Sequence, residues 1–128
     1  MLVGIAASGK TTWCKTALPR HVRISLDDIK RHDRRFENRM VEDELQKGNN
    51  IAIDDTNLTR EIRKRHISVA KRYGASIKVM FFDVDVQKAH RQNSARNKDV
   101  PHFVLDMQKM QLERPSEDEG IDFIQIIR

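Results

Sequence analysis

The sequence predicts an α/β domain in which helices cover both faces of a parallel sheet of about five strands. Short apolar runs alternate with longer amphipathic stretches, a pattern typical of right-handed crossover connections. A glycine-rich turn joins the first apolar run directly to the first amphipathic stretch. The length of 128 residues suits one domain with a single packed core, and we expect residues 1–128 to form it.

The expected elements can be placed along the chain by their apolar periodicity and their turn residues. The apolar runs that we predict as strands are residues 1–3, 21–25, 50–54, 76–82 and 122–127. The stretches that we predict as helices are residues 10–18, 27–47, 59–73, 86–96 and 101–113. Pro19, Gly48 and Gly74 stand between elements, where turns are expected. Strands separated by helices favour a parallel sheet, because each return to the next strand needs a crossover.

Composition narrows the environment and the partners of the chain. Charged residues make up 34% of the sequence and the formal net charge is +5, which fits a polyanionic partner without requiring one. No apolar stretch approaches the roughly 20 residues that cross a bilayer, and no signal peptide is recognisable, so we expect no membrane contact. Cys14 is the only cysteine, which suits a cytoplasmic location. The sequence is compatible with an oligomer.

The glycine-rich turn carries the most specific motif. Residues 4–11, GIAASGKT, match the phosphate-loop pattern G-x-x-x-x-G-K-T. In such a loop backbone N–H groups point at the β- and γ-phosphates, Lys10 adds a positive charge, and the Thr11 hydroxyl is placed to ligate Mg²⁺. The alternative is an ordinary glycine turn before a helix. The motif predicts a site for ATP or another nucleoside triphosphate, formed by Gly4, Ala6, Ala7, Ser8, Gly9, Lys10, Thr11 and Thr12.

Two carboxylates follow the second predicted strand, at the sheet edge where ligands of such folds bind. Asp28 is expected to cap the long helix that follows. Asp27 is expected to face the phosphate loop and to act as a general base that takes the proton of an attacking hydroxyl. Lys30 lies one helical turn later, where it could hold a phosphate of the acceptor. The plainer interpretation is that both aspartates only stabilise the helix N-terminus.

The third predicted strand also ends in acidic residues. Asp54 and Asp55 follow an apolar run, which is the pattern of a strand that ends at a Mg²⁺ site. We expect Asp55 to act through a metal-bound water or to orient Thr11, although either carboxylate could serve. Thr56 and Asn57 follow at the same edge and are predicted to bind substrate. The alternative is an ordinary turn.

A basic segment precedes a break at Val100 and Pro101. Phosphoryl transfer requires positive charge near the transferring group and the exclusion of water. Arg91 and Arg96 are therefore predicted to contact the donor nucleotide from a lid, with Arg96 acting in catalysis, and Lys98 is a further candidate. The alternative is the solvated face of a helix.

These motifs together resemble the kinase domain of P-loop polynucleotide 5′-hydroxyl kinases. The resemblance runs in the same order from Gly4 to about Arg114, through the segments GKTTW, SLDDIK, DDTNL, YG, FDV, NSAR and VP. It implies a P-loop kinase-type sheet, ATP and Mg²⁺ as cofactors, and a nucleic acid with a 5′-hydroxyl end as acceptor. It also implies Asp27 as the base, Lys30 as a contact to the phosphate on the 3′ side of the acceptor nucleotide, and Arg96 as a contact to the donor phosphates.

The chain departs from the family at three of these positions. Lys30 and Leu26 stand where the family usually or often has arginine, and Gln92 aligns with one of two lid arginines. The main hypothesis is transfer of a γ-phosphoryl to 5′-hydroxyl ends of DNA or RNA in end repair. The basic runs 30–35 and 60–65 favour it. A small-molecule kinase acting on a sugar, nucleoside or antibiotic is the alternative enzyme, and a nucleotide-gated binding module is favoured least.

Overall fold

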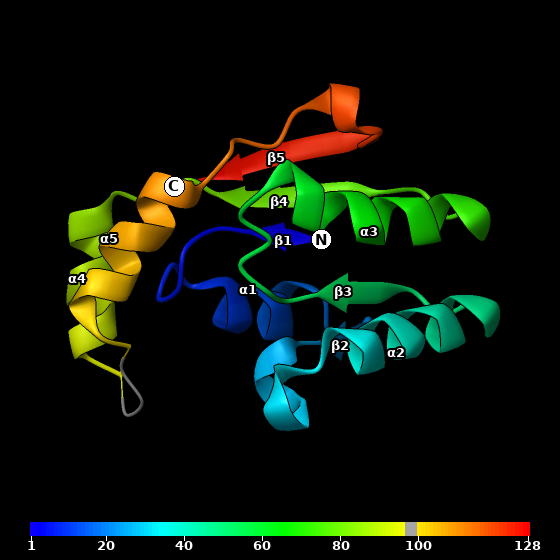
Figure 1. Ribbon diagram of the computed structural model, residues 1–128, viewed down its shortest axis with the longest axis horizontal. Coiled ribbons are helices and arrows are strands. Elements are labelled where there is room, and N and C mark those ends of the chain that lie inside the picture. Colours follow the sequence, from blue (N-terminus) through cyan, green and yellow to red (C-terminus); the bar gives the residue numbers. More distant parts are fainter. Residues whose placement is uncertain (97–99) are drawn as a thin grey trace.

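The computed structural model describes residues 1–96 and 100–128 and contains a parallel five-stranded sheet. β1 pairs with β4, β4 with β5, and β2 with β3, all in parallel register. A bridge between Leu2 and Asp54 joins the two groups into the order β2-β3-β1-β4-β5 (Figure 1). The predicted fold class is confirmed. The strands are β1 (Leu2–Val3), β2 (Val22–Ile24), β3 (Ile51–Ile53), β4 (Lys78–Phe82) and β5 (Phe123–Ile127).

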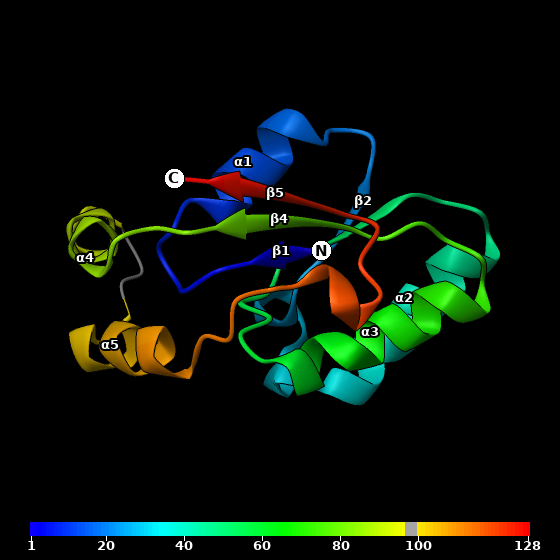
Figure 2. The same ribbon diagram turned by 90° about the horizontal axis from the view of Figure 1, so that it is seen from above.

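Helices cover both faces of the sheet. Figure 2 shows α1 on one face, α2 and α3 on the other, and the pair α4 and α5 beyond the carboxyl ends of the strands. No helix in the described ranges is long and apolar enough to cross a membrane. The helices are α1 (Lys10–Ala17), α2 (Arg34–Gln46), α3 (Arg60–Arg72), α4 (Val86–Ser94) and α5 (His102–Gln111), with 3₁₀ turns η1 (Leu26–Asp28), η2 (Lys30–His32) and η3 (Glu117–Glu119).

Alternate residues of the central strands pack on opposite faces of the sheet. Leu2 and Ala52 belong to the apolar cluster that contains Cys14 of α1. Val3 packs in the cluster against α3, and Ile53 packs in a third cluster with side chains of α2 and α3. This period of two is that of a strand buried on both faces. It also decides where the acidic residues after β3 point.

The predicted helix over residues 27–47 is wrong in its first third. The chain leaves β2 through η1 and η2, with Arg31 and His32 at φ 61° and 48°, and α2 begins only after Asp33. The Asp33 carboxylate accepts the N–H groups of Arg35 and Phe36 at 2.9 and 3.4 Å, so Asp33 and not Asp28 caps the helix.

A tertiary hydrogen bond accounts for this interruption. The Leu26 N–H donates to Asp55 Oδ1 at 2.8 Å, which pins the chain across the strand ends before it can enter a helix. Asp28 instead pairs with Arg23 at 2.6 Å. The two partners of the pinning bond are 29 residues apart in sequence, so local helix propensity could not reveal it.

A buried ion pair fixes the turn that follows β3. Arg63 of α3 is fully buried and contacts the two oxygens of Glu119 at 2.9 and 3.1 Å. Its Nη1 also donates to the carbonyl oxygens of Asn57 and Leu58. Both ions are therefore paired and hydrogen-bonded, which a buried ion pair requires. The turn at residues 55–58 is held between α3 and the C-terminal segment.

Candidate active site

The phosphate loop is packed tightly against the end of β4. A Cβ atom on Gly4 would lie 3.0 Å from both Cβ and O of Phe82, so only glycine fits there without a shift. The Gly4 N–H donates to Thr56 O at 3.0 Å. Gly9 begins α1 at φ 93°, and Ala7 adopts φ 61°, a left-handed conformation that is unusual for alanine. These contacts curl the backbone around the N-terminus of α1.

Lys10 is held inside this loop. Its side chain is 8% exposed and donates to the carbonyl oxygens of Ile5 and Gly4 at 2.7 and 3.0 Å. Burial, opposed by the charge of Asp54 and aided by that of Arg96, lowers the pKa of Lys10 to about 8. A bound phosphate would supply the negative charge that restores the ordinary affinity of this amine for its proton.

Asp54, rather than Asp55, contacts the phosphate-loop threonine. The Thr11 hydroxyl donates to Asp54 Oδ2 at 2.7 Å, and Arg23 Nε donates to the same oxygen at 2.8 Å. Of the two carboxylates that the sequence left open, Asp54 and not Asp55 therefore orients Thr11, and the action of Asp55 through a metal-bound water stays a prediction. Successive side chains along a strand point to opposite faces of the sheet. Asp54 therefore lies on the α1 face, like Ala52, and Asp55 lies on the α2–α3 face, like Ile53.

Thr11 and Asp54 form a pair of hard oxygen donors. Such donors are the ligands that Mg²⁺ prefers, and Mg²⁺ usually keeps several waters and binds the phosphates of the substrate as well. The hydroxyl and the carboxylate lie together at the phosphate loop. The pair therefore fits the chemistry of this ion. Arg23 fixes the carboxylate from the other side, a role that the sequence analysis missed.

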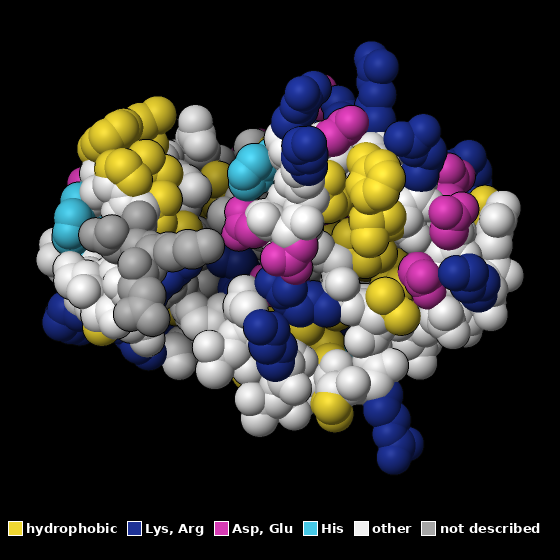
Figure 3. Space-filling model, turned by 90° about the horizontal axis from the view of Figure 1, so that it is seen from below, with side chains coloured by type: hydrophobic (Ala, Val, Ile, Leu, Met, Phe, Trp, Pro, Cys, Tyr) yellow, Lys and Arg dark blue, Asp and Glu magenta, His cyan; other side chains and the backbone are white. Residues whose placement is uncertain are grey.

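A cleft of about 1020 Å³ opens at the carboxyl ends of the strands. Figure 3 shows the hollow between the α4–α5 pair and the rest of the molecule. The large apolar side chains in its wall are those of Trp13, Leu26, Phe82, Val84 and Ile127. Most of the predicted site residues line it together, namely Ala6, Ala7, Ser8, Gly9, Lys10, Thr11, Thr12, Asp27, Asp55, Thr56 and Arg96.

Asp27 reaches this cleft from η1. Its backbone N–H donates to the Ser25 hydroxyl at 3.3 Å, which holds the turn. Its side chain is 86% exposed, and its one ion pair within the described residues is with His32, at 3.9 Å. An exposed carboxylate at the cleft rim has a lone pair free for the proton of an incoming hydroxyl.

Four predicted contacts are not brought to the cleft wall. Asn57 is 1% exposed, and its Nδ2 donates to Leu2 O at 2.7 Å, so its side chain anchors the turn to β1 and does not face the cleft. Gly4 shapes the loop without lining the cleft, and Lys30 and Arg91 are exposed outside it. Lys30 is displaced because η2 replaces the expected helical turn. Lys98 lies outside the described residues.

The cleft also contains polar residues that the sequence analysis did not select as ligands. His32 and Arg34 line it beside Asp27. Lys88 and Gln92 of α4 also line the cleft, and together with Arg96 they are spaced four residues apart. Residues at this spacing share one face of a helix, so the sequence could have indicated that they face the cleft together. The side chain of Gln108 from α5 accepts the N–H of Ala6 at 2.8 Å, and no local pattern could have indicated this contact.

Comparison with known proteins places the chain in a family. Residues 1–115 match the model of a family described as an AAA domain. The bifunctional polynucleotide phosphatase/kinase of Schizosaccharomyces pombe is 25% identical over 127 aligned residues, which are 94% of this chain and only 31% of the relative. A gluconokinase from Sinorhizobium meliloti 1021 matches with a TM-score of 0.67 and 16% identity over 98% of this chain and 79% of the gluconokinase. The chain belongs to the AAA domain family, and its fold is that of a P-loop kinase domain.

Proposed function

We propose that the protein is an ATP-dependent kinase that transfers the γ-phosphoryl group to 5′-hydroxyl ends of DNA or RNA. One observation carries the proposal. A single cleft holds the phosphate-loop Lys10 and the exposed carboxylate of Asp27, with the Arg34 guanidinium in the same lining and the His32 imidazole 3.9 Å from Asp27. A phosphate site, a base and a binding surface for a second anion are the parts that phosphoryl transfer to a polynucleotide needs.

The donor nucleotide binds at the phosphate loop in this proposal. Backbone N–H groups at the start of α1 and the Lys10 ammonium hold the β- and γ-phosphates. Arg96 approaches from the end of α4, at the opposite wall of the cleft. Thr11 and Asp54 would hold Mg²⁺, which would supply positive charge to the phosphates of the donor.

Asp27 acts as the base in the transfer step. The 5′-hydroxyl oxygen forms a bond to the γ-phosphorus while the bond from that phosphorus to the β–γ bridging oxygen breaks. The hydroxyl proton passes to Asp27, and ADP is the leaving group. Lys10 and Arg96 neutralise the charge that develops on the transferring group and on the departing ADP.

The acceptor side favours a polyanion over a small alcohol. Arg34 and His32 line the cleft beside Asp27, and the exposed side chains of Lys30, Arg31 and Arg35 continue this basic surface away from the cleft. Nucleic-acid phosphates are recognised mainly by such side chains. The similarity to a protein named a polynucleotide phosphatase/kinase supports the same acceptor class.

The test compares acceptors directly. We expect transfer of labelled phosphate from ATP to 5′-hydroxyl oligonucleotides, and much weaker transfer to nucleosides, sugars and gluconate. Arg34→Ala should raise the KM for the oligonucleotide, whereas Lys47→Ala, just beyond the other end of α2, serves as the matched control. Efficient labelling of a small alcohol without labelling of any oligonucleotide would establish the small-molecule kinase and overturn the proposal.

A further inference from the structure

A buried group of three potential metal ligands lies behind the turn that carries Asp27. Glu37 comes from α2, Asp55 from the end of β3 and His66 from α3. Glu37 is fully buried, and the other two residues are nearly so. One ligand atom from each side chain lies within 4.8 Å of the others, and Glu37 Oε1 is 3.7 Å from His66 Nε2.

Three of the four carboxylate oxygens of this group have no hydrogen-bond donor within the described residues. Within the described residues, neither oxygen of Glu37 nor Oδ2 of Asp55 has one. Buried carboxylates without donors are costly, because the lost hydration is not replaced. Arg23 of β2 is committed to Asp54 and Asp28, and Arg34 acts on Glu37 through its charge without a hydrogen bond to it. These three buried oxygens are therefore available to a ligand that carries positive charge.

The histidine of the group does not supply that charge. Burial lowers the pKa of His66 to about 4, so the imidazole is neutral with a lone pair available. Burial, and the Asp55 carboxyl beside it, raise the pKa of Glu37 to about 9, so without a metal the two carboxyls share a proton that a bound ion would displace. One imidazole nitrogen and two carboxylates form a ligand set that suits Zn²⁺, Mn²⁺ or Co²⁺.

We propose that Glu37, Asp55 and His66 bind one divalent transition-metal ion. This site is separate from the Mg²⁺ site of the donor nucleotide, because Thr11 and Asp54 lie on the α1 face of the sheet and the three ligands lie on the α2–α3 face. The remaining coordination positions would be filled by water.

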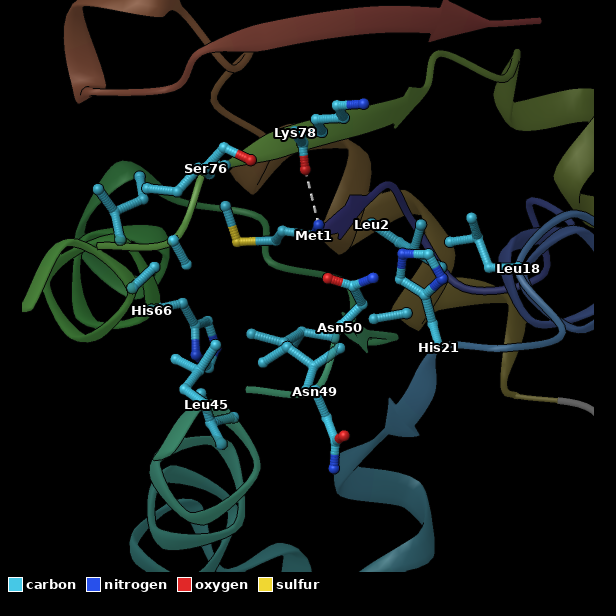
Figure 4. A pocket seen from close by; sticks show the side chains of 18 of the residues that line it. Met1, Leu2, Leu18, His21, Leu45, Asn49, Asn50, His66, Ser76 and Lys78 are labelled. Carbon is cyan, nitrogen blue, oxygen red and sulfur yellow. Dashed lines mark hydrogen bonds between the residues drawn. The ribbon is translucent and has the colours of Figure 1, made fainter. Parts of the chain in front are cut away.

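The site lies close to the cleft, through which an ion could enter, and it contacts the turn that carries Asp27. Asp55 lines the nucleotide cleft. Figure 4 shows His66 among the side chains around a second cavity, of about 410 Å³, at the other end of β3. Asp55 Oδ1 also accepts the N–H of Leu26, next to Asp27. A bound ion would fix the Asp55 carboxylate and through it the turn that presents Asp27, which makes the three ligands positioning residues.

The test measures metal binding without nucleotide. Chelator-treated full chain is incubated with Zn²⁺ or Co²⁺, passed through a desalting column and analysed for bound metal, and its thermal unfolding is followed by circular dichroism. We expect one ion per chain and a higher Tm with metal. Glu37→Gln and His66→Gln should each weaken binding at least about tenfold, whereas Glu42→Gln on α2 and Thr11→Val at the other site should retain it.

Two results would overturn the site. One is a parent chain that retains no stoichiometric metal and shows no rise in Tm. The other is a folded Glu37→Gln or His66→Gln variant that binds metal as tightly as the parent. Glu37→Gln should fold, because the change removes one buried, unpartnered carboxylate. If either variant fails to fold, the other and the metal content of the parent chain still decide the question.

Discussion

The two sides of the cleft are built in different ways. On the donor side, Lys10 is buried, Thr11 is hydrogen-bonded to Asp54, and most contacts go to backbone atoms of one continuous loop. On the proposed acceptor side, Asp27 is exposed. Besides its backbone bonds, its turn is held by two bonds to side chains, from Leu26 N–H to Asp55 and from Asp27 N–H to Ser25. The donor side is therefore preorganised, whereas the acceptor side depends on a few side chains.

The largest expected effect lies on the acceptor side. Asp27→Asn should lower the single-turnover rate by about 10²- to 10⁴-fold with ATP binding largely kept, because an amide cannot take the hydroxyl proton. Asp28→Asn is the matched control: its carboxylate pairs with Arg23 near the surface, so the rate should change little. If Asp28→Asn lowers the rate and Asp27→Asn does not, the base is assigned to the wrong carboxylate.

Removal of the phosphate-loop lysine should come next. Lys10→Ala removes the charge that faces the donor phosphates, and we expect a loss of about 10²- to 10³-fold in kcat/KM with cooperative unfolding retained. Lys15→Ala, on the exposed part of α1, should behave like the parent. Full activity of Lys10→Ala in a steady-state assay with ATP would contradict the donor site as described.

The end of α4 tests whether the far wall takes part in the reaction. Arg96→Ala should lower kcat by about 10- to 10²-fold with an unchanged Tm, because Arg96 lines the cleft and is exposed. Arg91→Ala should be nearly neutral, because Arg91 lies outside the cleft. The opposite ranking of the two variants would mean that α4 turns when nucleotide binds.

The smallest effect separates the neighbouring carboxylates after β3. Asp55→Ala removes the acceptor of the Leu26 N–H and should raise the KM for the oligonucleotide by about 3- to 10-fold, with little change in the KM for ATP. Asp54→Ala should instead raise the requirement for Mg²⁺ and the KM for ATP. Equal effects of both variants on both substrates would remove the distinction between the two sides of the cleft.

Much of the donor side could be predicted from the sequence because its geometry is local. The eight residues from Gly4 to Thr11 contain the turn, the lysine and the hydroxyl in one continuous segment, and they lie in the cleft or shape the loop behind it. The strands were predicted within a few residues because each contains a short run of mainly apolar residues between turn residues. The exposed Asp27 was predicted to reach the cleft, and it does, although not from a helix.

Most of the errors involve contacts between distant segments, whereas the Asp33 cap is a local contact. The amphipathic pattern of residues 27–47 indicated one helix, and it failed where Asp55 holds Leu26 and Asp33 caps α2. Asn57 lies in a segment with the composition of a turn, at the edge of the predicted site. Its side chain instead donates to the carbonyl oxygen of Leu2, 55 residues away. Gln108 reached the phosphate loop from 102 residues away.

The sequence by itself determined the fold class, the phosphate loop and the strand ends that carry most of the candidate site residues. Only the tertiary structure decided which carboxylate after β3 faces Thr11, and that Glu37, Asp55 and His66 meet. The physical reason is the reach of the interactions. Backbone conformation and apolar periodicity act over a few residues, so they can be read locally. Hydrogen bonds between side chains on different elements depend on how the sheet and helices pack, and that packing is set by the whole chain.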